Sequence, residues 1–150
     1  MKVVIQRVSK ASVLVKGKVE GKIKFGLLIF LGISSDDNID DIHWLTNKIS
    51  NLRIFNNEEG IMNISIKDNK GEALVISQFT LHAKTKKGNR PSYIKAAKPE
   101  SAILLYREFI KILKQNLGRE IQTGVFGANM KVNLVNDGPV TLIIDSKNRQ

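Results

Sequence analysis

The chain has 150 residues, no cysteine, and 24 Lys and Arg against 14 Asp and Glu, which gives a formal net charge of +10 at pH 7. This length suits one domain, which we assign to residues 1–150, and a hydrophobic content of 42% is typical of a globular rather than a disordered chain. Because cysteine is absent and the two histidines are isolated, disulfides, cysteine-ligated zinc, iron–sulfur clusters and thiol nucleophiles are excluded, and we expect no metal and no cofactor.

The first third of the chain predicts β-strands. Residues 3–5 and 11–15 are short β-rich runs, and the turn chemistry of 16–18 predicts a hairpin into the residues that follow. Residues 22–33 end in a continuous apolar run, as expected for a strand covered on both faces. This longest apolar run is far shorter than the roughly 20 residues of a membrane-spanning helix. No signal peptide is apparent, so we expect a soluble cytoplasmic protein with no membrane partner.

Two amphipathic helices are predicted. Asp36 and Asp37 stand at the expected N-cap of the first helix, and His43 on this helix is expected to face solvent. Its apolar side chains recur at helical spacing: Ile39, Ile42, Leu45, Ile49 and Leu52. The second helix is expected to begin at Pro99 and to end at Gly118. Its apolar stripe comprises Ala102, Ile103, Tyr106, Phe109, Ile110, Leu113 and Leu117.

Further short strands complete the pattern. They are predicted at 53–55, 73–81, 121–125, 131–135 and 140–145, and the composition of 56–60 marks a turn. The strands outnumber the helices and do not alternate regularly with them. The fold class expected from this pattern is therefore α+β.

A cationic segment follows the predicted strand at 73–81. Residues 82–99 hold six positive charges and no acidic residue: Lys84, Lys86, Lys87, Arg90, Lys95 and Lys98. A solvated loop usually dilutes such a run with acidic residues, so the cluster favours a polyanionic partner, nucleic acid above all. The alternative, that the protein is basic without such a partner, stays open on charge alone.

Common catalytic and nucleotide motifs are missing. The sequence has no G-x-x-x-x-G-K-[ST], G-x-G-x-x-G, H-E-x-x-H or G-x-S-x-G pattern. His82 lies two residues after Thr80, so on a strand the two side chains would share a face and their pairing is geometrically possible. No third group is evident to orient the imidazole, as a catalytic triad requires.

Three short segments invite a functional reading beside a structural one. The polar residues of 77–81 mark either a pocket or the exit of a strand into solvent. In 126–130, the terminal Phe and Met either stack on a base or pack around a tight bend. Residues 136–141 are, by local chemistry, a hairpin turn in which Pro139 restricts Gly138.

These segments, in this order, resemble the D-aminoacyl-tRNA deacylase family, also called D-tyrosyl-tRNA deacylases. The sequences that carry the resemblance are SQFTL at 77–81, FGANM at 126–130 and NDGPVT at 136–141. It extends over nearly the whole chain, through residues 5–8, 11–13, 26–32, 52–55 and 87–92. No motif position departs from the pattern.

The resemblance implies an enzyme, a carboxylic ester hydrolase that releases D-amino acids from the terminal ribose of tRNA. Members also remove glycine from mischarged tRNA, here expected to be tRNA-Ala, and reject L-amino acids, which makes them chiral proofreaders of translation. The implied architecture is a single-domain, barrel-like mixed and antiparallel sheet with two main helices. The implied partners are the aminoacylated 3′ end of tRNA and a second copy of the chain, because each active site lies at a homodimer interface.

Site residues follow from the same resemblance. Gly138 and Pro139 match a Gly-cisPro motif that enters the other subunit's pocket, and Arg7 matches the arginine that holds this motif. Four residues match the strand end at the scissile ester: Ser77, Gln78, Phe79 and Thr80. Three match positions near the terminal adenosine: Phe126, Met130 and Ala96. We expect four cations to contact the RNA backbone: Lys84, Lys86, Lys87 and Arg90.

The mechanism is not decided by the resemblance. Thr80 is an obvious candidate nucleophile, but a hydroxyl needs an activating base and none is evident. We favour a substrate-assisted route, in which a ribose hydroxyl helps to activate water while Thr80 and the backbone of Gln78 and Phe79 position the ester. Two alternatives remain: a non-catalytic tRNA-binding module, and a general ester hydrolase that acts without tRNA.

Overall fold

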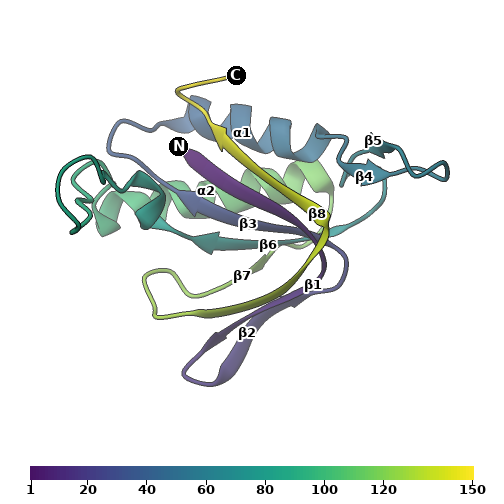
Figure 1. The fold of residues 1–150 in the computed structure, drawn as a ribbon, viewed down its shortest axis with the longest axis horizontal. Helices are drawn as coiled ribbons and strands as arrows, with labels where there is room; N and C mark the ends of the chain where they lie inside the picture. The colour runs from purple at the N-terminus through teal and green to yellow at the C-terminus, as the bar shows by residue number, and fades with distance from the viewer.

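A strongly curved mixed sheet carries the fold, and two helices cover one of its faces (Figure 1). The computed structural model describes all 150 residues. The sheet has the order β2-β1-β3-β6-β7, and β8 pairs with β1 along most of the length of β1. The elements are β1 (Lys2–Val15), β2 (Lys18–Ile23), β3 (Gly26–Gly32), α1 (Ile39–Asn51), β4 (Phe55–Asn56), β5 (Met62–Ile64), β6 (Glu72–Ser77), a 3-10 helix (Phe79–His82), α2 (Pro99–Leu117), β7 (Gln122–Thr123) and β8 (Lys131–Asp145).

Strand β1 organises the sheet. The two short strands expected at 3–5 and 11–15 are wrong as separate elements, because they are parts of one 14-residue strand. Its first half pairs antiparallel with β3, and its second half pairs with β2 through the predicted hairpin. Polar residues between the halves interrupt the apolar pattern, but β8 pairs with β1 on both sides of them, with shifts of register between Gln6 and Lys10, so the strand does not end there.

The sheet curls until its two ends nearly meet. Strands β3, β6 and β7 run parallel, while β2 approaches β7 from the opposite end of the order. At this approach a Cβ on Gly21 would lie 2.5 Å from the carbonyl oxygen of Thr123, so only glycine fits there. The fold is thus the α+β, barrel-like mixed sheet with two helices that the sequence and its resemblance predict.

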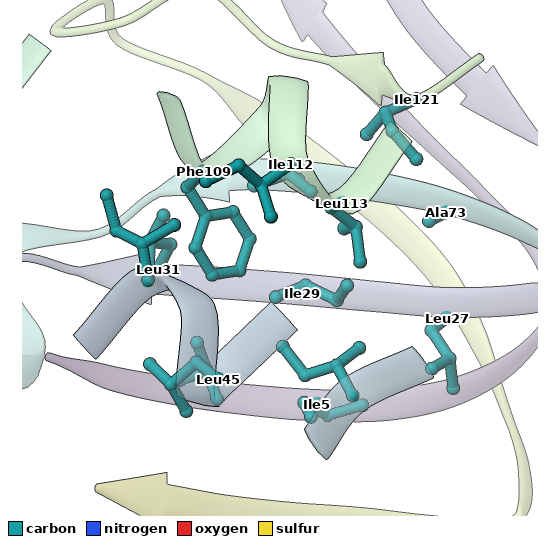
Figure 2. Packing of buried hydrophobic residues seen from close by; sticks show 14 of the residues in the cluster. Ile5, Leu27, Ile29, Leu31, Leu45, Ala73, Phe109, Ile112, Leu113 and Ile121 are labelled. Carbon is teal, nitrogen blue, oxygen red and sulfur yellow. The ribbon is translucent and has the colours of Figure 1, made fainter. Parts of the chain in front are cut away.

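Two apolar clusters stabilise this arrangement. The larger contains 22 buried residues between the helices and the sheet, and Figure 2 shows Phe109, Ile112 and Leu113 of α2 facing Ile29 of β3. The smaller, of seven buried residues, fills the inside of the curl and includes Leu28. Strand β3 therefore contributes alternate side chains to both clusters, which confirms the prediction that it is covered on both faces.

The helices occupy their predicted places. Pro99 stands in the first turn of α2, and Gly118 caps its end with a left-handed φ of 66°. The predicted N-cap of α1 is wrong: Asn38 takes this position and forms a capping box with Asp41, whereas Asp37 accepts from the Ser34 amide. His43 is exposed, as expected. No helix is long and apolar enough to cross a membrane.

The strand expected at 121–125 is shortened to β7, and two further strand boundaries differ from expectation. The strand predicted to reach residue 81 ends at Ser77, and the chain turns into the 3-10 helix at Phe79. The short strand expected at 53–55 begins at Phe55 and pairs with β5 in a small hairpin that projects from the sheet (Figure 1). At both places the local sequence is compatible with a strand, and tertiary contacts determine where the strand begins or ends.

A buried polar cluster joins the first and last strands to α1. Asp41 accepts from the hydroxyl of Ser146 at 2.6 Å and from the ammonium of Lys147 at 2.9 Å. The Ser146 hydroxyl also lies 2.9 Å from the amino group of Met1, which pairs with Asp37. Burial raises the pKa of Asp41, but the bonds from Lys147, Ser146 and the Asn38 amide outweigh it and lower this pKa from 3.8 to about 2.

We predict that this cluster makes the fold acid-labile. A folded-state pKa below the unfolded value stabilises the protein above pH 4, and this stabilisation is lost as the pH falls toward the folded pKa of about 2. The shift corresponds to about 2 kcal/mol. Urea unfolding between pH 2 and pH 7 should therefore show a shallower pH dependence for Asp41→Asn than for the wild type. Asp40→Asn, at the exposed neighbouring position, is the control; an equal flattening in both variants would contradict the assignment.

Candidate functional site

A cavity of about 560 Å³ opens beyond the carboxyl ends of β3 and β6. Parallel strands β3 and β6 end side by side here, so the residues after each strand meet at one edge of the sheet. The lining is mainly apolar, with Ser77, Gln78 and Asn129 as its polar members. Small or aromatic side chains form most of the wall, which leaves a smooth space suited to a planar group.

The segment after β6 forms one side of the cavity. The amide of Gln78 donates to the carbonyl of Leu31 at 2.8 Å, which ties the chain to β3 before it turns. The side-chain amide of Gln78 donates to the Thr80 hydroxyl. Ser77, Gln78 and Phe79 line the cavity, whereas the next residue, half-buried Thr80, is not one of the lining residues.

His82 does not pair with Thr80. The imidazole is buried, and its Nε2 has no hydrogen-bond partner. The geometric possibility raised by their spacing required a strand, but the chain is already a 3-10 helix from Phe79 to His82, so residues two apart no longer share a face. Thr80 therefore has an amide, not an imidazole, as its hydrogen-bonding neighbour.

The opposite side comes from two distant parts of the chain. Phe126 and Met130 line the cavity, and the Phe126 ring lies 5.4 Å from the ring of Tyr106 on α2. Tyr106 in turn donates from its hydroxyl to the carbonyl of Val75 at 2.9 Å, and burial raises its pKa above the ordinary value. Ala96 completes this side. Residues 77–79, Ala96 and residues 126–130 thus come from three segments distant along the chain and meet in one cavity.

The cationic segment flanks the mouth. Lys84 and Ser92 exchange backbone hydrogen bonds of 2.8 and 3.0 Å, which close a loop between them. The four expected RNA-contacting residues, Lys84, Lys86, Lys87 and Arg90, are all exposed on this loop. Sequence reasoning missed Tyr93, which lines the cavity and lies 5.0 Å from Phe79. Its signal was an aromatic side chain within a basic segment.

Residues 137–140 form a bulge rather than a hairpin turn. The predicted strands at 131–135 and 140–145 are both parts of β8, and both pair with β1. Between the pairs Val8↔Asn136 and Gln6↔Thr141, β8 has four residues where β1 has only Arg7. The Gly138–Pro139 peptide within this bulge is cis. The turn prediction failed because the pairing of both flanks with a single strand is a tertiary fact.

Arg7 holds the bulge. Its guanidinium is buried and donates to the carbonyls of Ile54 at 2.7 Å and Asp137 at 3.2 Å, and it pairs with the Asp137 carboxylate at 3.2 Å. A Cβ on Gly138 would lie 2.5 Å from Arg7 Nη2, so the two groups are in close contact. The Asn136 amide spans the base of the bulge, donating to the carbonyls of Arg7 and Val140 at 2.9 and 3.0 Å.

The bulge and the cavity lie at different ends of the sheet. Arg7 pairs with Leu27 at the start of β3, whereas the cavity begins at Leu31 near its end. Four residues of extended strand separate these positions by about 13 Å. Neither Gly138 nor Pro139 lines the cavity of its own chain.

The chain is similar to known proteins over its whole length. The D-Tyr-tRNA(Tyr) deacylase family profile matches residues 4–145. Proteins named D-aminoacyl-tRNA deacylase from Flavobacterium psychrophilum and Bacteroides thetaiotaomicron are 62% and 59% identical to this chain, each over 100% of both chains.

Two solved structures share the fold. One, described as a c-Myc DNA Unwinding Element Binding Protein, has a TM-score of 0.92 at 39% identity and covers 97% of this chain and 98% of its own. The other, described as a probable eukaryotic D-amino acid tRNA deacylase, has a TM-score of 0.82 at 17% identity, covers 95% and 97%, and supports the fold alone. Given the profile match and the full-length relatives, this chain belongs to the D-Tyr-tRNA(Tyr) deacylase family, a family of hydrolases.

Proposed function

We propose that residues 1–150 act as one D-aminoacyl-tRNA deacylase domain, which hydrolyses the ester between a D-amino acid and the terminal ribose of tRNA in the cytoplasm. The observation that carries the proposal is the mainly apolar cavity with a few polar groups in its lining and a cationic loop at its mouth. Its volume of about 560 Å³ lies in the range of small-molecule sites, which suits a terminal nucleoside with its amino acid. The loop cations meet the phosphates that such a substrate brings.

The two sides of the cavity suit two different parts of the substrate, the adenine base and the ester. Phe126, Met130 and Ala96 offer the apolar, planar surface that the adenine base needs. Ser77, Gln78 and the backbone of Phe79 lie on the other side, where their polar groups suit the ester. The exposed loop cations Lys84, Lys86, Lys87 and Arg90 contact the RNA backbone, which adds affinity that falls with salt and carries little sequence preference.

Thr80 positions the ester rather than attacking it. The hydroxyl accepts from the Gln78 amide, which is not a base, and His82 is not bonded to it. A threonine hydroxyl without a base is a poor nucleophile. The aminoacyl ester is already activated, so a neighbouring ribose hydroxyl that helps to activate water, together with backbone N–H groups near the developing oxyanion, suffices for hydrolysis.

Chiral selection requires a second copy of the chain. The bulge at Gly138 and Pro139 is a rigid wall of backbone carbonyls held by Arg7, yet it lies about 13 Å along the sheet from its own cavity. In a homodimer the bulge of one protomer enters the cavity of its partner, accepts the ammonium of a D-amino acid and clashes with an L side chain. Glycine, which has no side chain to reject, is accepted, so glycyl-tRNA-Ala is a further substrate.

The exposed edge of β8 supports such a dimer. β8 pairs only with β1, so its second edge is free over 15 residues, and Ile143 on it is 76% exposed. A long free edge with apolar side chains favours pairing with another copy.

The second candidate, a non-catalytic tRNA-binding module, uses the same cavity and cations but assigns no role to the Arg7-held bulge. Incubation of the purified protein with D-tyrosyl-tRNA and L-tyrosyl-tRNA separates the two. We expect release of D-tyrosine and retention of L-tyrosine, measured by the loss of acid-precipitable label. Binding of D-tyrosyl-tRNA without release would leave only the binding module. No hydrolysis of small aryl esters is expected, because the tRNA end supplies most of the binding surface.

Replacement of Thr80 tests the mechanism. For Thr80→Ala we expect kcat/KM on D-tyrosyl-tRNA to fall about 10-fold, the size of one lost hydrogen bond. Thr85→Ala, a change at an exposed threonine of the neighbouring loop, is the matched control and should match the wild type. A fall of about four orders of magnitude in Thr80→Ala alone would instead identify a nucleophile.

A mixed dimer tests whether the bulge acts across the interface. Arg7→Lys keeps the charge but not the forked hydrogen bonds, so its homodimer should lose discrimination between D- and L-tyrosyl-tRNA. Ala96→Phe should fill the cavity and abolish hydrolysis. In a dimer with one variant of each kind, the open cavity meets a native bulge from its partner, and discrimination should return.

The mass of the protein by light scattering should be twice the chain mass of 16.8 kDa. If the mixed dimer fails to discriminate, as the Arg7→Lys homodimer does, the bulge does not act on the cavity of the partner protomer. A monomer that still discriminates between the two substrates would also contradict action across the interface.

A further inference from the structure

The rings of Phe79 and Tyr93 form an exposed aromatic corner at the mouth of the cavity. Their centroids are 5.0 Å apart and their planes meet at 75°. Both line the cavity, yet Phe79 is 57% and Tyr93 38% exposed, so much of the ring surface faces outward. Exposed aromatic rings lack the stabilisation that burial of their apolar surface gives, unless a ligand or partner covers them.

The backbone on both sides of Tyr93 is anchored. Ser92 closes the cationic loop by its two hydrogen bonds with Lys84, and the Ala96 amide donates to the Tyr93 carbonyl at 2.9 Å. The chain is then tied to the end of β3 by a bond of 2.9 Å from the Ala97 amide to the Ile33 carbonyl. The corner is therefore preformed, and a ligand that binds there does not need to order it.

The geometry of the pair suits a planar ring. When the edge of one ring points at the face of the other, a planar group stacked on the first ring also lies edge-on against the second. A nucleobase meets both surfaces in the arrangement that aromatic quadrupoles favour. The corner has no charged group, so it does not distinguish bases strongly, but the loop beside it is strongly cationic.

We propose that the Phe79–Tyr93 corner is a subsite for the base of the second nucleotide from the 3′ end of the RNA. The inference rests on the proposed function, in which the cavity holds the terminal nucleoside, and adds where the strand goes next. The strand leaves the cavity at the mouth, stacks its penultimate base on the corner and continues toward the exposed cations at Lys84, Lys86, Lys87 and Arg90. The occupant is single-stranded RNA, because a paired base offers no free face to the corner.

Binding of short RNA tests the subsite without reference to hydrolysis. The probes are the trinucleotide CpCpA and the same trinucleotide with an abasic ribose at the penultimate position, which keeps every phosphate. We expect the wild type to bind CpCpA about 5- to 150-fold more tightly than the abasic probe, measured by calorimetry, the range for one base stacked on an aromatic side chain. Tyr93→Ala should weaken CpCpA to the level of the abasic probe and leave the abasic probe unchanged.

Two variants serve as controls. Tyr93→Phe keeps the ring and should bind both probes as the wild type does. Phe25→Ala removes an aromatic side chain that is 47% exposed just before the start of β3, away from the cavity, and should also bind as the wild type. If Tyr93→Ala weakens both probes equally, the ring belongs to the subsite of the terminal adenosine and the proposal is wrong. Equal affinity of the wild type for the two probes would also overturn it.

Kinetics supply a second readout that separates this proposal from the proposed function. Tyr93→Ala should raise KM for D-tyrosyl-tRNA by about 5- to 150-fold with kcat unchanged, and leave kcat/KM for D-tyrosyl-adenosine as in the wild type. An equal loss on both substrates counts against the subsite. If the wild type hydrolyses neither substrate, the deacylase proposal fails, and the RNA-binding comparison still decides the subsite.

Discussion

The contact between Arg7 and the bulge of β8 is the constraint on which the geometry of the paired strands β1 and β8 depends. β1 and β8 form the longest ladder of the sheet, and Arg7 stands at the one place where β8 has four residues against a single residue of its partner. A buried guanidinium is costly without partners, and this one is bonded to two backbone carbonyls and a carboxylate. The excess residues of β8 are thereby held in one shape, pressed against the arginine at Gly138. The bulge is therefore a fixed part of the sheet and not a hairpin turn.

The cavity depends on a different set of contacts, at the other end of the same strands. Its floor is set by α2, where the Tyr106 hydroxyl bonds the Val75 carbonyl and the ring supports Phe126. Its rim is set by the anchored stretch from Ser92 to Ala97. The cavity is lined by Leu31 of β3, Ile76 of β6 and Val132 of β8, whereas Arg7 lies in β1 and the bulge lies farther along β8, outside the lining. In the proposed dimer, the bulge that selects the substrate belongs to one protomer, and the cavity that holds the substrate belongs to the other.

Much of the fold could be read from residue patterns. The apolar stripes of both helices, the hairpin after Val15, the doubly covered β3 and the cap at Gly118 follow from local periodicity and propensity, which are properties of neighbouring residues. The errors share one cause. The break expected within β1, the turn expected at 136–141 and the strand expected to reach residue 81 were all judged from local chemistry, whereas partner strands decided each of them. Asn38 displaced Asp37 as the N-cap because Asp37 is engaged by Met1 and the Ser34 amide.

By itself, the sequence determined the α+β class, the surplus of positive charge next to residues 77–81, and the motifs that carry the family resemblance. These depend on which residues are present and on their order. The resemblance implied that Arg7 holds the Gly138–Pro139 motif and that Ser77, Ala96, Phe126 and Met130 border the substrate. Only the tertiary structure decided how these residues contact one another, that Tyr93 joins Phe79 at the mouth of the cavity, and that residues 137–140 form a bulge opposite Arg7. Each of those relations joins segments distant along the chain, and distance in space is set by strand register and helix packing, which local sequence does not encode.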